Sequence, residues 1–226
     1  MQLTLFTVLA STLLTQLPSA QAWGSGGYGW GGSGGWVSGE SPPCTAGNVI
    51  SFNTYQSKYV DTCAGCASSS LAEVKTLGSF KSTSDSDLAA QWEVVSGGSS
   101  FLGKVAFKNK KTGKFLGRCT SAACRNLAID PKILPIIATE GSVSANNVWQ
   151  CGIIFVDPSI DSSGTSWGFL GGDGQYLAHP ATNVLPVKSG SDLQLGLKNV
   201  TGSGSFTAHS SVAFAPRVIF DANVEG

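Results

Sequence analysis

The sequence has few charged residues and no surplus of either sign. Only 12% of its 226 residues are charged, and 14 Lys and Arg residues balance 14 Asp and Glu residues. Proteins that bind nucleic acids neutralise phosphates with an excess of Lys and Arg, which this composition does not hold. At 42% hydrophobic residues, the chain is still apolar enough to build a core. The composition therefore predicts a globular protein and argues against a nucleic-acid ligand.

Linked catalytic and metal-binding motifs are also missing. His179 and His209 are the only histidines, and neither stands in a ligand spacing such as HExxH. No GxSxG motif is present, so the chain offers no nucleophile with a linked base. Asp85 and Asp87 form a close carboxylate pair, but they lie in a Ser-rich run that is typical of a solvated loop. We therefore expect no enzyme activity, no cofactor and no metal site.

Long apolar runs are absent apart from one near the N-terminus. This run spans residues 3–14, Pro18 ends it, and residues 20–22 have the Ala-Gln-Ala pattern that signal peptidase cleaves. It is too short to cross a bilayer. No Lys or Arg precedes it, which is atypical, and a buried N-terminal helix or strand is the alternative. The sequence predicts a signal peptide at residues 1–22, a secreted extracellular protein and no membrane insertion.

Residues 23–40 form a Gly-rich segment in which 9 of 18 residues are Gly. So much Gly raises the conformational entropy that would be lost on ordering, so we predict a disordered tail over residues 23–43. The tail contains Trp30 and Trp36, whose flat apolar faces could stack on sugar rings or on a partner surface. We take both as candidate ligand contacts, and a plain linker is the alternative.

From Cys44 onward, one pattern recurs in three copies. Each copy has two apolar-aromatic segments around a turn, which predict a β-hairpin, then a third apolar segment and a final aromatic residue. The third and fourth anchors recur at steps of 56 or 57 residues. The anchors stand at 49–52, 58–60, 70–72 and Trp92, at 105–107, 114–116, 126–128 and Trp149, and at 167–169, 175–177, 183–185 and Phe206.

Three copies of a four-stranded unit predict an all-β domain with the architecture of a β-trefoil. A propeller typically needs about four or more blades to close, and a sandwich requires no threefold similarity. In a β-trefoil, six strands form a barrel and three hairpins cap one end, so no strand edge is exposed. We predict a β-trefoil of three four-stranded repeats over residues 44–226, with the repeats at about 48–100, 101–163 and 164–220.

The second copy carries the motif VAFKNKKTGKFLG at residues 105–117, echoed at 49–60 and 166–177. With this motif the chain resembles the fascin-like branch of the β-trefoil fold. The repeats are expected to consist of extended segments, with helix as a local alternative only at Leu71 to Leu77. The resemblance implies that the repeated aromatic residues are mainly core, namely Phe52, Tyr59, Trp92, Phe107, Phe115, Trp149, Phe169, Tyr176 and Phe206.

Six cysteines in a secreted chain predict disulfide bonds, and the sequence alone leaves 15 pairings open. The repeats narrow the choice, because Cys63 and Cys119 stand at the same place in two copies and each has a close neighbour. A CxxC redox pair or a four-thiolate zinc site are the alternatives, and an oxidising compartment favours disulfides over both. The predicted pairs are Cys63 with Cys66, Cys119 with Cys124, and Cys44 with Cys151.

A polar residue follows the second predicted strand of each copy. Thr62, Arg118 and His179 occupy this position, where we expect exposed side chains, and we take them as candidate ligand contacts. Asn199 begins the only N-glycosylation sequon and lies in a Gly/Ser-rich connection. We expect Asn199 to be modified in a eukaryotic host, and an unmodified loop residue is the alternative.

These features favour a secreted binding protein over an enzyme. The resemblance implies a carbohydrate ligand, because similar β-trefoils often present loops and shallow aromatic pockets, although the QxW repeats of ricin-type lectins are absent. A proteinase inhibitor that uses one of the long connections, for instance that from Pro131 to Gly141, is one alternative. An extracellular structural or host-interaction protein whose tail self-associates is another. The predicted signal peptide argues against actin bundling, the activity of fascin itself.

Overall fold

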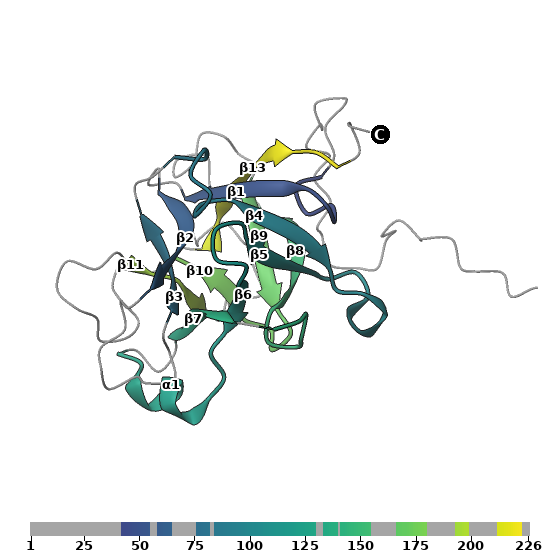
Figure 1. The fold of residues 1–226 in the computed structure, drawn as a ribbon. Coiled ribbons are helices and arrows are strands. Elements are labelled where there is room, and N and C mark those ends of the chain that lie inside the picture. The colour runs from purple at the N-terminus through teal and green to yellow at the C-terminus, as the bar shows by residue number, and fades with distance from the viewer. Residues whose placement is uncertain are drawn as a thin grey trace, which may run out of the picture. The chain divides into compact units, whose positions relative to one another are not determined.

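The described part of the chain is almost entirely β-structure (Figure 1). The computed structural model describes residues 42–54, 58–64, 76–81, 84–129, 133–139, 141–154, 166–179, 193–198 and 212–222, all within one unit, Gly32–Gly226. The prediction of an all-β chain with little helix is confirmed. Several predicted features lie outside these residues: the signal peptide, most of the tail with Trp30 and Trp36, Cys66, Pro131, Asn199, Phe206 and His209.

Six strands pair in a closed antiparallel ring. Ring closure leaves no open strand edge among these six. The order around the ring is β1 (Val49–Thr54), β4 (Trp92–Ser96), β5 (Val105–Asn109), β8 (Val148–Ile154), β9 (Ser166–Gly171) and β13 (Phe214–Phe220), which returns to β1.

Three further strand pairs extend from this barrel. They are β2 (Tyr59–Ala64) with β3 (Thr76–Lys81), β6 (Phe115–Arg118) with β7 (Ile133–Thr139), and β10 (Tyr176–Ala178) with β12 (Gly196–Lys198). The pairs touch one another, since β7 pairs with both β3 and β12, and β11 (Leu193–Gln194) pairs with β3. A six-stranded barrel with three attached pairs is a β-trefoil-like fold.

Two local alternatives considered from the sequence differ from the strands that the structure describes. Residues 133–139, placed in a connection when a proteinase inhibitor was considered, form β7, whose β-branched Ile residues suit a strand paired on both sides. Residues 76 and 77, where helix was the alternative, begin β3. The helix that does occur, α1 (Ala122–Leu127), was not predicted, and it covers most of the segment 126–128, which was expected to be extended. The third strand of this repeat is β7 instead. Its N-cap is Ser121, whose Oγ accepts a hydrogen bond from the Cys124 amide at 3.3 Å.

No helix in the described ranges is long and apolar enough to cross a membrane.

The core is built on one aromatic residue from each repeat. Phe52, Phe107 and Phe169 are fully buried, and their ring centroids lie 5.1 to 5.3 Å apart in all three pairings. Trp92 and Trp149 are also fully buried. Each indole N–H donates a hydrogen bond to a backbone carbonyl, of Val60 in β2 and of Leu116 in β6 respectively. Burying an aromatic side chain of this size contributes about 2 to 3 kcal/mol, so these rings form a large part of the stabilising core.

The predicted core residues behave in three ways. Seven of them are buried, Tyr59 is only half-buried, and Phe206 lies outside the described residues. In the third repeat, the buried aromatic residue that begins the last barrel strand is Phe214, which packs 5.6 Å from Phe169. A constant step of 57 residues misses Phe214 because the connection before β13 is longer than those before β4 and β8.

Two disulfides lie within the described residues, and both are pairs that the sequence predicts. Cys44 and Cys151 are joined with their Cα atoms 6.5 Å apart, which fastens the start of the domain to β8. Cys119 and Cys124 are joined with Cα atoms 6.0 Å apart across the start of α1. Cys63 is also disulfide-bonded, while its predicted partner, Cys66, lies outside the described residues.

Candidate ligand-binding site

The three equivalent polar residues are buried, so the prediction that they are exposed is wrong. Thr62 is 9% exposed, Arg118 5% and His179 4%. For two of them the reason is a contact with the aromatic residue at the start of the fourth strand. The Arg118 guanidinium lies 5.9 Å from the Trp149 ring, and the His179 ring meets the edge of Phe214 at 5.2 Å. The repeats therefore predict correctly that these residues occupy equivalent positions, but not that their side chains are buried.

The side chain of His179 packs inside the protein. Its Nε2 lies 3.1 Å from the Ala213 carbonyl oxygen, and both residues are buried. A buried imidazole that contacts a backbone carbonyl and a phenyl ring contributes to packing rather than to an open site. The assignment of His179 and Thr62 as ligand contacts stays a prediction.

Arg118 lies at the edge of a surface pocket of about 380 Å³. The pocket is formed where the second repeat meets the β9–β10 turn of the third. Its polar lining comes from the connection before β5, the end of β6, α1 and the β7–β8 connection. The residues that matter chemically are Lys104, Arg118, Thr120, Arg125, Asn146 and Asp173, with Phe101 and Val148 as apolar lining.

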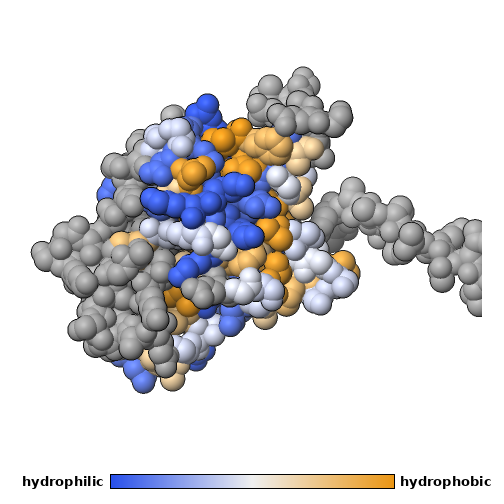
Figure 2. All heavy atoms as spheres, in the orientation of Figure 1, coloured by the Kyte–Doolittle hydropathy of each residue, from blue (hydrophilic) through white to orange (hydrophobic). Residues whose placement is uncertain are grey.

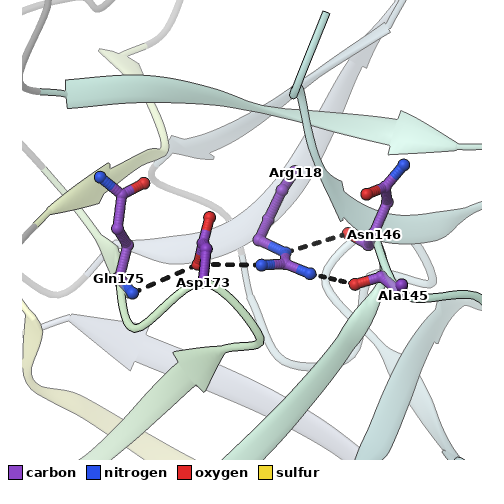
Figure 3. A network of polar contacts seen from close by, with 5 residues as sticks. All are labelled: Arg118, Ala145, Asn146, Asp173 and Gln175. Atoms are coloured by element: carbon purple, nitrogen blue, oxygen red, sulfur yellow. Dashed lines mark hydrogen bonds and ion pairs between the residues drawn. The ribbon is translucent and has the colours of Figure 1, made fainter.

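Arg118 is held in place from several directions (Figure 3). Its Nη1 lies 2.9 Å from Asp173 Oδ1, its Nε donates to the Asn146 carbonyl at 3.4 Å, and its Nη2 donates to the Ala145 carbonyl. Asp173 is positioned in turn, because Oδ1 accepts a hydrogen bond from the Gln175 amide at 3.2 Å. Three acceptors occupy only part of the five N–H groups of a guanidinium. Arg118 is therefore a fixed part of the pocket wall.

The β9–β10 turn depends on a glycine for its close approach to Arg118. A Cβ on Gly171 would stand 2.9 Å from both Cδ and Nη1 of Arg118, and 2.9 Å from Asp173 Oδ1. No side chain fits there without moving the ion pair. The sequence Gly-Gly-Asp-Gly, which already predicts a turn, thus also brings a carboxylate of the third repeat onto an arginine of the second.

The pocket is positively charged. Lys104, Arg118 and Arg125 line it, against the single carboxylate of Asp173. Arg125 is exposed on α1, and Lys104 is half-buried with its Nζ 3.8 Å from where a Cβ on Gly172 would stand. Such a site suits a polar ligand with hydrogen-bond acceptors. Among the described residues, no group of three His, Cys, Asp or Glu side chains could hold a metal ion.

Sequence reasoning missed most of this pocket. Five of its polar residues were not identified from the sequence, because they belong to different elements and share no motif. They are Lys104, Thr120, Arg125, Asn146 and Asp173. A usable signal was present in the charge distribution. Residues 94–129 contain no Asp or Glu but hold seven of the 14 Lys and Arg residues, which a net charge of zero conceals.

The carboxylate pair at Asp85 and Asp87 has structural contacts. Asp85 forms an ion pair with Arg217, and both line a second pocket of about 320 Å³. Asp87 Oδ1 accepts a hydrogen bond from the Ala89 amide at 2.9 Å. These contacts organise the loop before β4, where both aspartates are half-buried.

No family model matches the chain, and no curated protein matches it. Solved structures do resemble it. One is a Caenorhabditis elegans protein described as having unknown function, at a TM-score of 0.51 and 13% identity, covering 77% of this chain and 95% of that one. Another is a Polyporus squamosus lectin bound to the human-type influenza-binding epitope Neu5Aca2-6Galb1-4GlcNAc, at 0.50 and 11%, covering 77% and 50%. These likenesses concern the fold alone.

Proposed function

We propose that the protein is a secreted, disulfide-stabilised β-trefoil that binds a carbohydrate in the pocket beside Arg118, without turning it over. The observation that carries this proposal is the preorganised lining of the pocket. Arg118 is fixed by Asp173 and by two backbone carbonyls, while Thr120 and Asn146 add hydroxyl and amide groups. Sugar hydroxyls need several donors and acceptors at fixed positions beside some apolar surface, which Phe101 supplies.

The structural comparison supports the same class of ligand. A lectin bound to a saccharide epitope has a similar fold, so this architecture can serve sugar recognition. At 11% identity no binding residue transfers from that lectin, and the assignment of the site rests on the pocket itself. Secretion, the disordered tail with Trp30 and Trp36, modification of Asn199 and membership of the fascin-like branch are parts of this proposal, supported by sequence patterns.

The connection at residues 131–141 is a poor candidate for an inhibitory loop, and an inhibitor that uses another long connection stays an alternative. The candidate inhibitory connection contains β7, which pairs with β6 on one side and with β12 on the other. A strand paired on both edges cannot present its backbone to a protease in the extended form that such an inhibitor would need. An extracellular structural or host-interaction role stays an alternative, and it predicts no glycan binding.

A glycan array with the full-length protein tests the proposal. We expect a restricted set of glycans to bind, and we expect Thr120→Val to weaken that binding because it removes a hydroxyl from the pocket without changing side-chain volume. Ser86→Ala, in the second pocket, is the matched control and should bind as the parent does. Inhibition of a protease without binding to any glycan would contradict the proposal.

A further inference from the structure

Half of the chain's positive charge is concentrated in one short segment. Seven of the 14 Lys and Arg residues lie within residues 104–125, and the nearest acidic residues in sequence are Glu93 and Asp130. The segment comprises β5, β6 and α1, so the basic residues gather on one repeat. A zero net charge therefore coexists with a strongly basic region.

Five of these seven cations stand at opposite ends of the β5–β6 hairpin. Lys104 precedes β5 and Arg118 ends β6, so both stand at the pocket end, where Arg125 joins them. Lys110 and Lys111 stand in the turn at the other end, and both are exposed. Figure 2 shows a broad hydrophilic area over β4 and β5, with hydrophobic surface beside it near the end of β13.

Nearby carboxylates offset only part of this charge. Asp173 pairs with Arg118, and Glu93 stands opposite Lys108 in the β4–β5 ladder. Within the part of the chain that the structure describes, Lys104 and Arg125 form no ion pair. Lys104 and Arg125 thus flank a pocket whose third cation, Arg118, is already paired with Asp173. This arrangement suits a ligand that carries a negative charge.

We propose that the ligand of this pocket is an acidic saccharide, whose carboxylate or sulfate group is bound by Lys104 and Arg125. This inference rests on the proposed function and adds the charge of the ligand to it. The preformed wall around Arg118, Thr120 and Asn146 would contact the sugar ring, while the two peripheral cations bind the anionic group. Uronates and sulfated sugars share this chemistry, and the experiment separates them.

The test compares two double variants that remove the same charge. Lys104→Gln/Arg125→Gln changes the pocket end, whereas Lys110→Gln/Lys111→Gln changes two exposed lysines at the far end of the same hairpin. Affinity is measured at physiological salt for oligogalacturonate, a sulfated oligosaccharide and a neutral oligosaccharide of equal length. We expect one acidic probe to bind best, and the pocket variant to weaken it about tenfold while the far-end variant changes it less than about twofold.

Each other result overturns either the acidic ligand or carbohydrate binding as a whole. Binding of the neutral probe alone overturns the acidic ligand but leaves carbohydrate binding intact, and binding of no saccharide overturns both. Equal losses in the two double variants would mean that binding is unspecific charge attraction. Equally tight binding of a polyphosphate would overturn the saccharide class. Melting temperatures of both variants should lie close to that of the parent, because no changed side chain is fully buried: Lys104 is half-buried and the other three are exposed.

Discussion

At the scale of single residues, the most constrained side chain of the pocket is Arg118. It is 5% exposed, and it contacts Asp173, two carbonyl oxygens and the face of Trp149. A lysine would keep the charge but not the planar fork that reaches these acceptors. We expect Arg118→Lys to lower the free energy of unfolding by about 2 to 3 kcal/mol in urea titrations.

The control for this prediction is Arg125→Lys, because Arg125 is exposed on α1. It should leave the stability unchanged. If both variants had the same stability as the parent, the contacts of Arg118 would not contribute to folding as described.

A second residue-scale prediction concerns Tyr176. Burial raises the pKa of its phenol above the ordinary value of 10.0, so the folded state favours the neutral form. The stabilisation is complete below about pH 10 and is lost as the pH rises through the raised pKa. We expect the unfolding free energy to fall above about pH 10, and to fall less in Tyr176→Phe. Parallel curves for the parent and the variant, measured by urea unfolding at several pH values, would contradict this.

At the scale of elements, the β5–β6 hairpin depends on Asn109. Its Oδ1 accepts hydrogen bonds from the Lys111 and Thr112 amides, at 3.2 and 3.1 Å, and its Nδ2 donates to the Ala89 carbonyl at 2.7 Å. The turn is completed by Gly113 at a φ of 69°. Because Asn109 is buried, its truncation leaves several polar groups unpaired.

We therefore expect Asn109→Ala to destabilise the protein by about 2 to 3 kcal/mol and to weaken ligand binding, because the same hairpin carries Lys104 and Arg118. Asn126→Ala, at an exposed position of α1, is the control and should change neither quantity. Thermal unfolding and titration with the bound glycan measure the two effects. A hairpin variant with unchanged stability would show that the turn forms without this side chain.

Elements were predictable where one periodic signal dominates. The core aromatic residues recur with the repeat, since each copy buries the same face, and the predicted hairpins around Phe52, Phe107 and Phe169 are present. Helix α1 was not predicted, because its six residues form too short a pattern and it starts from a single capping residue, Ser121. The pocket was not predicted, because Asp173 reaches Arg118 from another repeat, a contact that depends on the pairing of β5 with β8 and of β8 with β9.

At the scale of the whole molecule, the Cys44–Cys151 bridge closes a loop with a sequence separation of 107. In the chain-entropy description, a loop of this length stabilises the folded state by about 4 to 5 kcal/mol. We expect the double variant Cys44→Ala/Cys151→Ala to lose about that much, which would approach the full stability of many domains. Guanidinium unfolding under non-reducing conditions measures the loss. A difference below about 1 kcal/mol would mean that the barrel constrains these ends without the bridge.

The central claim is that a saccharide binds in the pocket beside Arg118. Backbone amide chemical shifts, recorded by NMR while the best glycan from the array is added, test it most directly. We expect the largest shifts on residues that line this pocket, namely Lys104, Thr120, Arg125, Asn146 and Asp173. Shifts confined to other surfaces, such as the second pocket around Asp85 and Arg217, would contradict the claim.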